Sequence, residues 1–490
     1  MKIVSQLELT PPLPTVYGPK DYRDFRAQLT EVDNLLVKSD VEERLIVSYF
    51  RGTANDEPSQ KDIDRARKAL RCCILKGLSA VDYREFANRL ADSQLWQWFA
   101  GYNTFGTTKT PGKSTVERFM KMFPEEDVCD AVKSLVSSVS DPDQVAGLLH
   151  CNEPILVEEI FADSTCVKAD IHFPVDWLLL RDGVRSLVKS IVCIRKQGLK
   201  HRIPAPEEFI RQINSWCIQM THSARKRDGK KNRKRILRAM KRLSKRISRH
   251  GRRYRDLLDS QWESTSWTRK QAELVLKRID NVLEKLPEAI HQAHERIIAG
   301  RLVPNERKIL SLHDDYAHVL IRGKAGSEVE FGNGLYLAEQ VDGLIVDWQL
   351  FEDQPPRDSK LVEESIERIE DGFGKIASYT ADRGFCSKHN ERVLRKGTIT
   401  NGICPKSPVD LEKRLTDESF VSLQKRRAQT EGRIGIFKNV YLGRPLRCRD
   451  VKHKQQIVAW SVLTHNLWLL AGKAREATEK IREQEYRRAA

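Results

Sequence analysis

The fold is decided by residues 376–385, IASYTADRGF. The first part of this stretch is apolar or β-favouring and ends in Asp382, after which Arg383-Gly384 provides a turn. We therefore predict a strand over residues 376–382 with an acid at its carboxyl end. Because functional sites of α/β sheets form at the carboxyl ends of strands, Asp382 is a candidate site residue.

The segments around this stretch alternate between helix and strand. Residues 359–372 have a helical pattern, and Ser387 can cap a helix that ends at Gly397. Residues 398–404 form a second predicted strand, and residues 315–350 contain β-rich runs separated by glycine turns. Strand, helix, strand, helix, strand is the order typical of an α/β sheet, which is the fold class we predict.

A second acid stands far upstream in a similar context. Residues 155–163, ILVEEIFAD, predict a strand that ends in Asp163, directly before Ser164-Thr165. About 218 residues separate Asp163 from Asp382. For either acid alone, the alternative interpretation is an ordinary exposed carboxylate at a strand end.

A third acid lies in a predicted helix. Arg427, Glu431 and Lys438 follow the spacing R-x3-E-x6-K. At about 100° per residue, these three side chains fall on one narrow stripe. A carboxylate between two cations suits a metal ion and a phosphate together. Gly432 and Gly435 lie in the same helix, and close approach of DNA or of the sheet would explain them.

Basic charge is concentrated in one block of the chain. Lys+Arg number 85 against 68 for Asp+Glu, which gives a net charge of +17 and a pI near 9.4. Residues 225–255 alone hold 17 Lys/Arg and one acid, Asp228. Such a block indicates a polyanionic partner, nucleic acid or an acidic membrane face; otherwise it is a solvated helix face or a disordered basic segment. The candidate phosphate-binding residues within it are Lys230, Lys231, Arg233, Lys234 and Arg235.

The pattern divides the chain into regions. Residues 1–150 predict a helical region and residues 151–473 an α/β domain, with a basic helical insertion at residues 195–305 and a charged C-terminal tail at residues 474–490. Heptad-like spacing of apolar residues predicts that the insertion contains two helices packed as a coiled-coil-like hairpin.

The N-terminal region contains a break rich in Gly, Thr and Pro at residues 101–112. Ser114 and Glu117 follow it with the spacing of a capping box, which predicts a helix start there. Helix, short loop and capped helix fit either a DNA-binding helix-turn-helix or an ordinary helical pair.

Several classes of protein are disfavoured by what the sequence lacks. The longest uncharged run, residues 455–472, contains Gln, His and Asn and predicts a core helix instead of a membrane span. The N-terminus has no signal-peptide pattern, and the ten Cys residues show no CxxC. His291 and His294 have no Cys or carboxylate partner at metal-ligand spacing, which predicts surface or packing positions. We expect a cytoplasmic protein without disulfides, zinc or membrane contact.

Together these motifs resemble the insertion-sequence DDE transposases, which have an RNase-H-like catalytic core, and among them the ISNCY-like group. The resemblance spans about residues 85–470. The matching elements are Ala162-Asp163-Ser164-Thr165, Ala381-Asp382-Arg383-Gly384-Phe385, Arg427/Glu431/Lys438, Phe173-Pro174-Val175-Asp176 with Leu178-Leu179-Leu180, and Lys324-Ala325-Gly326 with Val329-Glu330-Phe331-Gly332.

The resemblance implies a mixed RNase-H-like sheet with flanking helices and a catalytic triad of Asp163, Asp382 and Glu431. The triad would ligate two Mg²⁺ ions, with Mn²⁺ able to substitute, for donor-end cleavage and strand transfer. Arg427 and Lys438 would position phosphates. The implied partner is double-stranded DNA, both transposon ends and target, bound by a homodimer. The implied location is the bacterial cytoplasm, at the nucleoid when DNA is bound.

Two positions stay open within the resemblance. Many relatives carry Tyr three residues before the Arg of the last motif, where this chain has Gln424, which argues against a hairpin-forming route. Arg383 either contacts phosphate or is a turn residue paired with a carboxylate. Two other functions share these motifs: an RNase-H-like DNA nuclease without strand transfer, and a catalytically inactive DNA-binding derivative, which would be expected to have lost an acid.

Overall fold

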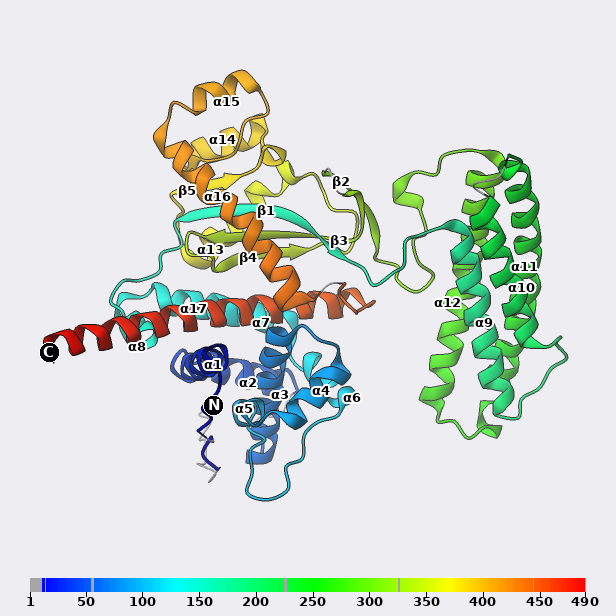
Figure 1. The fold of residues 1–490 in the computed structure, drawn as a ribbon, viewed down its shortest axis with the longest axis horizontal. Coiled ribbons are helices and arrows are strands. Elements are labelled where there is room, and N and C mark those ends of the chain that lie inside the picture. Colours follow the sequence, from blue (N-terminus) through cyan, green and yellow to red (C-terminus); the bar gives the residue numbers. More distant parts are fainter. Residues whose placement is uncertain are drawn as a thin grey trace. The chain divides into compact units, whose positions relative to one another are not determined.

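The protein is mixed α/β and contains a six-stranded mixed sheet. The computed structural model describes residues 11–13, 15–53, 57–223, 227–324, 327–443 and 445–489. The chain forms two compact units, one from residues 1–167 and 334–490 and the other from residues 168–333 (Figure 1). None of the described helices combines the length and the apolar character that crossing a membrane requires.

Most of the described part of residues 1–150 is helical, as predicted, and the apolar faces of the helices pack into the core of the first unit. The predicted capping box is wrong. α6 begins at Lys113 with the extended residue Gly112 as its N-cap, so Ser114 already lies inside the helix. The helices are α1 (Lys20–Lys38), α2 (Val41–Gly52), α3 (Gln60–Ser79), α4 (Tyr83–Asp92), α5 (Gln94–Phe99), α6 (Lys113–Met120), α7 (Glu125–Ser140) and α8 (Pro142–Leu149).

The sheet has the strand order β2-β3-β1-β5-β6, and β4 also pairs with β3. β5 pairs in parallel with β1 and with β6, whereas β3 pairs antiparallel with β2 and with β4. The strands are β1 (Glu159–Lys168), β2 (His318–Lys324), β3 (Ser327–Gln340), β4 (Ile345–Leu350), β5 (Ser378–Ala381) and β6 (Thr400–Asn401).

β1 differs from its predicted extent. It begins later than residue 155 and, instead of ending at Asp163, it continues to Lys168. The reason is that β1 also pairs with β3 on its other side. Next to the end of β1, the Ala169 amide still donates a hydrogen bond to the Phe331 carbonyl of β3. The prediction that Asp163 ends a strand is therefore wrong.

Two further strands differ from expectation. The strand predicted over residues 398–404 has only two residues, because only Thr400 and Asn401 pair with β5. β3 was not predicted as a strand of its own, although it occupies the middle of the predicted β-rich region.

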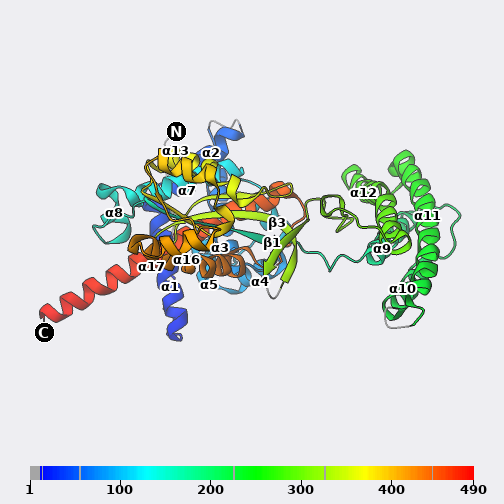
Figure 2. The ribbon, with the colours of Figure 1, turned by 90° about the horizontal axis from the view of Figure 1, so that it is seen from above.

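The C-terminal helices cover the sheet within the first unit. Ser387 caps α14 by accepting the Asn390 amide, as predicted. The uncharged run lies in α17 and is a core helix, with Trp460 fully buried. Figure 1 shows α17 between the sheet and the N-terminal helices, and Figure 2 shows its last turns projecting outward. The elements are η4 (Asp358–Lys360), α13 (Val362–Phe373), η5 (Arg383–Phe385), α14 (Lys388–Lys396), α15 (Pro408–Arg414), α16 (Glu418–Ile436), the π-helical turn η6 (Phe437–Leu442) and α17 (Val451–Ala489).

The second unit contains a bundle of long helices. The predicted pair, α11 and α12, does pack together, but both helices also contact α9, and α10 contacts α9 and α11. The apolar stripe of α11 faces this shared core, and its basic residues lie outside the core. The elements are α9 (Asp176–Lys196), α10 (Pro206–Ser223), α11 (Gly229–Gln261), η1 (Trp262–Ser264), α12 (Arg269–Ala293), the π-helical turn η2 (His294–Ala299) and η3 (Asn305–Arg307).

Candidate active site

Strand register brings the first two acids together. β1 and β5 pair in parallel up to Ala162 opposite Ala381. Asp163 and Asp382 are the next residue on each strand, and neighbouring strands lie about 4.8 Å apart. The two predicted acids are therefore neighbours across the sheet, despite their distance in the sequence.

The electrostatics of Asp163 show which charges surround it. Burial, together with the nearby Asp382 and Glu431 carboxylates, raises the pKa of Asp163 to about 6. A hydrogen bond of 2.7 Å from the Ser164 amide and the charge of Arg427 oppose this rise in pKa. The other two predicted acids and Arg427 thus all act on the pKa of Asp163.

Asp382 has a structural task as well. Its Oδ1 accepts a hydrogen bond of 2.7 Å from the Gly384 amide and so caps the turn η5. Arg383, in the same turn, is exposed, and within the described ranges it forms no ion pair with a carboxylate. The alternative that Arg383 is a turn residue paired with an acid is therefore not observed.

A buried carboxylate that was not predicted docks α16 against the sheet. Glu339, near the end of β3, is only 4% exposed. Its Oε1 accepts hydrogen bonds from the Thr430 hydroxyl at 2.8 Å and from the Arg426 guanidinium at 3.1 Å, and lies 3.5 Å from Arg433 Nη1. These three residues lie on one face of α16, so Glu339 fixes the rotation of the helix that carries Glu431.

Gln424 makes the second attachment of α16. Its amide Nε2 donates hydrogen bonds to the carbonyl of Gly402 at 2.6 Å and to that of Ala381 at 3.3 Å. Its Oε1 accepts a hydrogen bond of 3.2 Å from Arg427 Nε. Gln424 therefore links the helix to the backbone next to Asp382 and orients the Arg427 guanidinium.

Arg427 and Glu431 face each other on α16. Arg427 Nη1 lies 3.7 Å from Glu431 Oε1, and the side chain of Glu431 is 59% exposed. Nη1 is buried and, among the described residues, makes no hydrogen bond. A buried guanidinium donor in this state has capacity for an anionic ligand such as a phosphate oxygen.

Lys438 is not on the predicted stripe. α16 ends at Ile436, and Lys438 lies in the π-helical turn that follows, where it is buried. Its Nζ donates a hydrogen bond of 2.8 Å to Thr165 Oγ1. Thr165 and Asp163 are two residues apart on β1 and face the same side, so the ammonium group is held roughly 7 Å along the strand from Asp163.

The described part of the chain contains no group of three His, Cys, Asp or Glu side chains close enough together to hold a metal ion. Asp163 and Asp382 nevertheless fit a divalent cation by their chemistry, because their carboxylates are hard oxygen donors. Burial and the charges of Asp382 and Glu431 raise the pKa of Asp163, and a bound cation would offset this repulsion. Glu431 would join them only after its exposed side chain turns away from Arg427.

The predicted phosphate-binding residues of the basic block lie on α11 in the second unit. Lys230, Lys231 and Arg235 are exposed, Lys234 is half-buried, and the Arg233 guanidinium lies 5.6 Å from the centre of the Trp177 ring. Arg225 and Lys226 lie outside the described residues, as do Ala325 and Gly326 of the motif that begins at Lys324.

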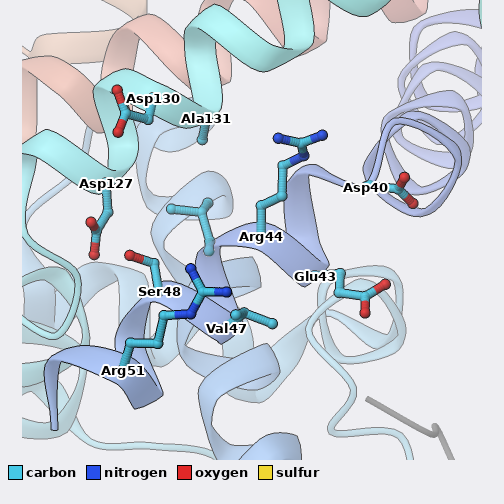
Figure 3. A pocket seen from close by; sticks show the side chains of 10 residues that line it. Asp40, Glu43, Arg44, Val47, Ser48, Arg51, Asp127, Asp130 and Ala131 are labelled. Atoms are coloured by element: carbon cyan, nitrogen blue, oxygen red, sulfur yellow. The ribbon is translucent and has the colours of Figure 1, made fainter. Parts of the chain in front are cut away.

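A separate hollow of about 510 Å³ lies between α2 and α7 of the first unit (Figure 3). Four carboxylates and two guanidinium groups line it together: Asp40, Glu43, Asp127 and Asp130 with Arg44 and Arg51. This mixture of charges gives no preference for an anion.

Comparisons with protein-family models, with curated proteins and with solved structures find no match. The geometry of the site is thus the basis for inferring function. Sequence patterns missed Glu339 and the role of Gln424. Both residues act through long-range contacts, which local patterns do not report. The one local signal for Glu339 was an acid that follows an apolar run near the end of β3.

Proposed function

We propose that this protein is a DDE transposase that catalyses metal-dependent cleavage of donor DNA ends and strand transfer into target DNA. The observation that carries the proposal is the register of β1 and β5, which makes Asp163 and Asp382 neighbours. The influence of Arg427 and Glu431 on Asp163 supports placing the third acid at the same site. The strand order β4-β3-β1-β5-β6, with its antiparallel and parallel pairs, supports an RNase-H-like sheet.

Asp163 and Asp382 would hold divalent cations, Mg²⁺ or Mn²⁺, and Glu431 would complete the ligand set. The bound cations would supply activation of the attacking water or 3′-hydroxyl and stabilisation of the leaving oxygen. Arg427 contributes the guanidinium donor with free capacity, which would orient a phosphate oxygen beside the acids. Lys438 holds a positive charge beside Thr165 on the same face of β1.

The exposed side of α16 has room for a DNA backbone. A Cβ added at Gly432 or Gly435 would meet nothing within 4 Å, so the sheet does not approach these glycines. Of the two explanations for the glycines, close approach of the sheet is therefore wrong, and close approach of DNA stays a prediction. Ile436, one residue further on, is 54% exposed.

The DNA partner would be double-stranded, with transposon ends and target bound by a homodimer at the nucleoid of a bacterial cytoplasm. The basic outer face of α11 supports a polyanionic partner, because electrostatic attraction to phosphates supplies most of non-specific DNA binding.

The test uses oligonucleotide duplexes taken from the DNA that borders this reading frame, incubated with Mg²⁺. We expect strand cleavage followed by joining of the new 3′-hydroxyl to a second duplex. Asp163→Asn and Asp382→Asn should each lower cleavage by roughly 1000-fold without loss of DNA binding. Asp371→Asn, at an exposed acid of α13, is the matched control. Cleavage without joining would favour the nuclease, and binding without either reaction would favour the inactive derivative.

A further inference from the structure

A hollow of about 680 Å³ between α11 and α12 of the second unit is lined by basic groups. Its polar lining includes Lys241, Lys245, Arg249 and Arg252 of α11, His291 of α12 and His294 at the start of η2. Pro287 and Ile290 provide an apolar wall. No Asp or Glu of the described residues lines this hollow, in contrast to the hollow between α2 and α7 (Figure 3).

The positive charge of this hollow is not neutralised within the described residues. None of its four Lys and Arg side chains forms an ion pair there, and Lys241 Nζ contacts the Nδ1 of His294 at 2.9 Å instead of a carboxylate. Two acids adjoin the lining in sequence, Glu288 and Glu295. Glu288 forms no ion pair among the described residues, and Glu295 is engaged by two hydrogen bonds from Arg301, at 2.5 and 2.9 Å. Burial and the neighbouring Lys245 lower the pKa of Lys241, as expected where cations gather without a counter-ion.

The lack of ion pairs extends along α11, and among its described Lys and Arg side chains Arg255 is the exception. Arg255 is paired with Asp256, Asp259 and Asp280. The hollow differs from the rest of α11 in its shape, because there the unpaired cations lie around a concave surface together with His291 and His294. Unpaired cations around a concave surface are typical of a site for an anion.

The spacing of the cations indicates an extended anion. Lys241, Lys245, Arg249 and Arg252 follow one another at steps of four, four and three residues, so they lie on one stripe of the helix. At 1.5 Å per residue the stripe is roughly 16 Å long. A DNA strand carries a phosphate about every 3.4 Å along the axis, so the stripe matches several consecutive phosphates, more than a single nucleotide offers.

We infer that the hollow between α11 and α12 binds consecutive backbone phosphates of double-stranded DNA. The choice of DNA as the polyanion rests on the proposed function, whereas the anion site itself rests on the uncompensated cations. The site lies further along α11 than the predicted phosphate-binding residues at 230–235, and it includes none of the three acids of the candidate active site.

The test compares two variants of the full chain that each remove two positive charges. Lys245→Ala with Arg249→Ala removes exposed groups that line the hollow, and Arg242→Ala with Arg253→Ala removes exposed groups of α11 that do not line it. Affinity for a fluorescent DNA duplex is measured by anisotropy between 50 and 200 mM salt, without metal. Circular dichroism confirms that both variants are folded.

The hollow variant should reduce the slope of log affinity against log salt by about 1.8, since each phosphate contact contributes about 0.9. The control variant should change the slope by less than about 0.5. Equal changes in both variants would show diffuse attraction and overturn the site, as would no change in either.

Vesicles of phosphatidylcholine with phosphatidylserine form the second arm. If the hollow variant lost vesicle binding while its DNA slope was unchanged, the inference would be wrong and the ligand would be a lipid surface. The outcomes also separate this site from the proposed function. If the hollow variant lowered the salt slope but the protein cleaved no DNA, the phosphate site would stand and the proposed transposase function would be wrong. If the protein cleaved DNA in a way that required Asp163 but the salt slope of the hollow variant was unchanged, the proposed function would stand and the phosphate site would be wrong.

Discussion

Gln424 donates a hydrogen bond of 2.6 Å to the carbonyl of Gly402, which ties α16 to the chain segment that follows β6. The same amide reaches the Ala381 carbonyl, one residue before Asp382, and its oxygen holds Arg427. The proposed likeness to DDE transposases would favour Tyr at this position. A tyrosine hydroxyl cannot donate two such bonds and also accept one from the guanidinium, so Gln424 makes a set of contacts that a tyrosine could not make.

Gln424→Leu should lower DNA cleavage about 10- to 100-fold, because Arg427 and the helix carrying Glu431 lose their attachment beside Asp382. The buried Gly402 carbonyl, left without this donor, should also lower the free energy of unfolding by about 1–3 kcal/mol, whereas the Ala381 carbonyl keeps the Cys404 amide. Cleavage rates and urea unfolding measure the two effects. Gln429→Leu, at an exposed position of the same helix, is the control. Equal rates in the two variants would show that Gln424 does not position the site.

Asp163 makes stability depend on pH. Its pKa in the folded protein is about 6, above the usual value near 3.9, so the charged form is disfavoured in the folded state. The resulting destabilisation is fully present above pH 6 and disappears as the pH falls toward 4. At pH 8, the free energy of unfolding of Asp163→Asn should therefore exceed that of the natural protein by up to about 3 kcal/mol. At pH 4 the two free energies of unfolding should be similar.

Urea unfolding at these two pH values, in buffer containing a chelator, measures this difference. Asp371→Asn should match the natural protein at both. An Asp163→Asn protein that was less stable than the natural one at pH 8 would contradict the burial of a repelled carboxylate at this position.

How much the sequence predicted follows from the range of the interactions involved. Caps and periodic patterns are local, so the helix capped by Ser387 and the helix containing Glu431 were found from their residues alone. Strand pairing is non-local. The strand predicted to end at Asp163 continues because β3 lies beside it, and no pattern near Asp163 reports that neighbour.

The candidate site shows the same limit. Each acid was identified from its local context, but the register that makes Asp163 and Asp382 neighbours needs the sheet. The stripe expected for Lys438 assumed α-helical geometry, which ends at Ile436 where the π-helical turn begins. The contact of Glu339 with Thr430 spans 91 residues and has no counterpart in either local pattern.

Glu339 should be important for stability as well as for the site. Its carboxylate is buried against Arg426, Arg433 and Thr430, so Glu339→Gln would leave two guanidinium groups without their counter-ion. We expect a loss of about 2–4 kcal/mol in the free energy of unfolding, below the range for fully buried pairs because both arginines keep some exposure. Glu412→Gln, at an exposed acid of α15, should change it by less than about 0.5 kcal/mol. A loss of under 1 kcal/mol for Glu339→Gln would show that α16 is held by its apolar contacts instead.

Arg427 should set the pH range in which the site binds metal. Its charge lowers the pKa of Asp163, so Arg427→Ala should raise that pKa further above 6. Since protons compete with the cation for the carboxylate, Mn²⁺ affinity should fall with decreasing pH near 6 in the natural protein, and the fall should begin at higher pH in Arg427→Ala. Calorimetric titration with Mn²⁺ between pH 5 and 8 measures the midpoint.

Arg427→Lys separates charge from geometry at this position. It keeps the positive charge, so the pH midpoint of Mn²⁺ binding should stay close to that of the natural protein. Lysine has no guanidinium group, so it cannot donate to Gln424 as Nε does and also offer a second donor, Nη1, to a phosphate oxygen. DNA cleavage should therefore still fall by at least about tenfold. If the lysine variant cleaved DNA at the natural rate, Arg427 would act only through its charge on Asp163, and the direct contact with a phosphate oxygen would be wrong.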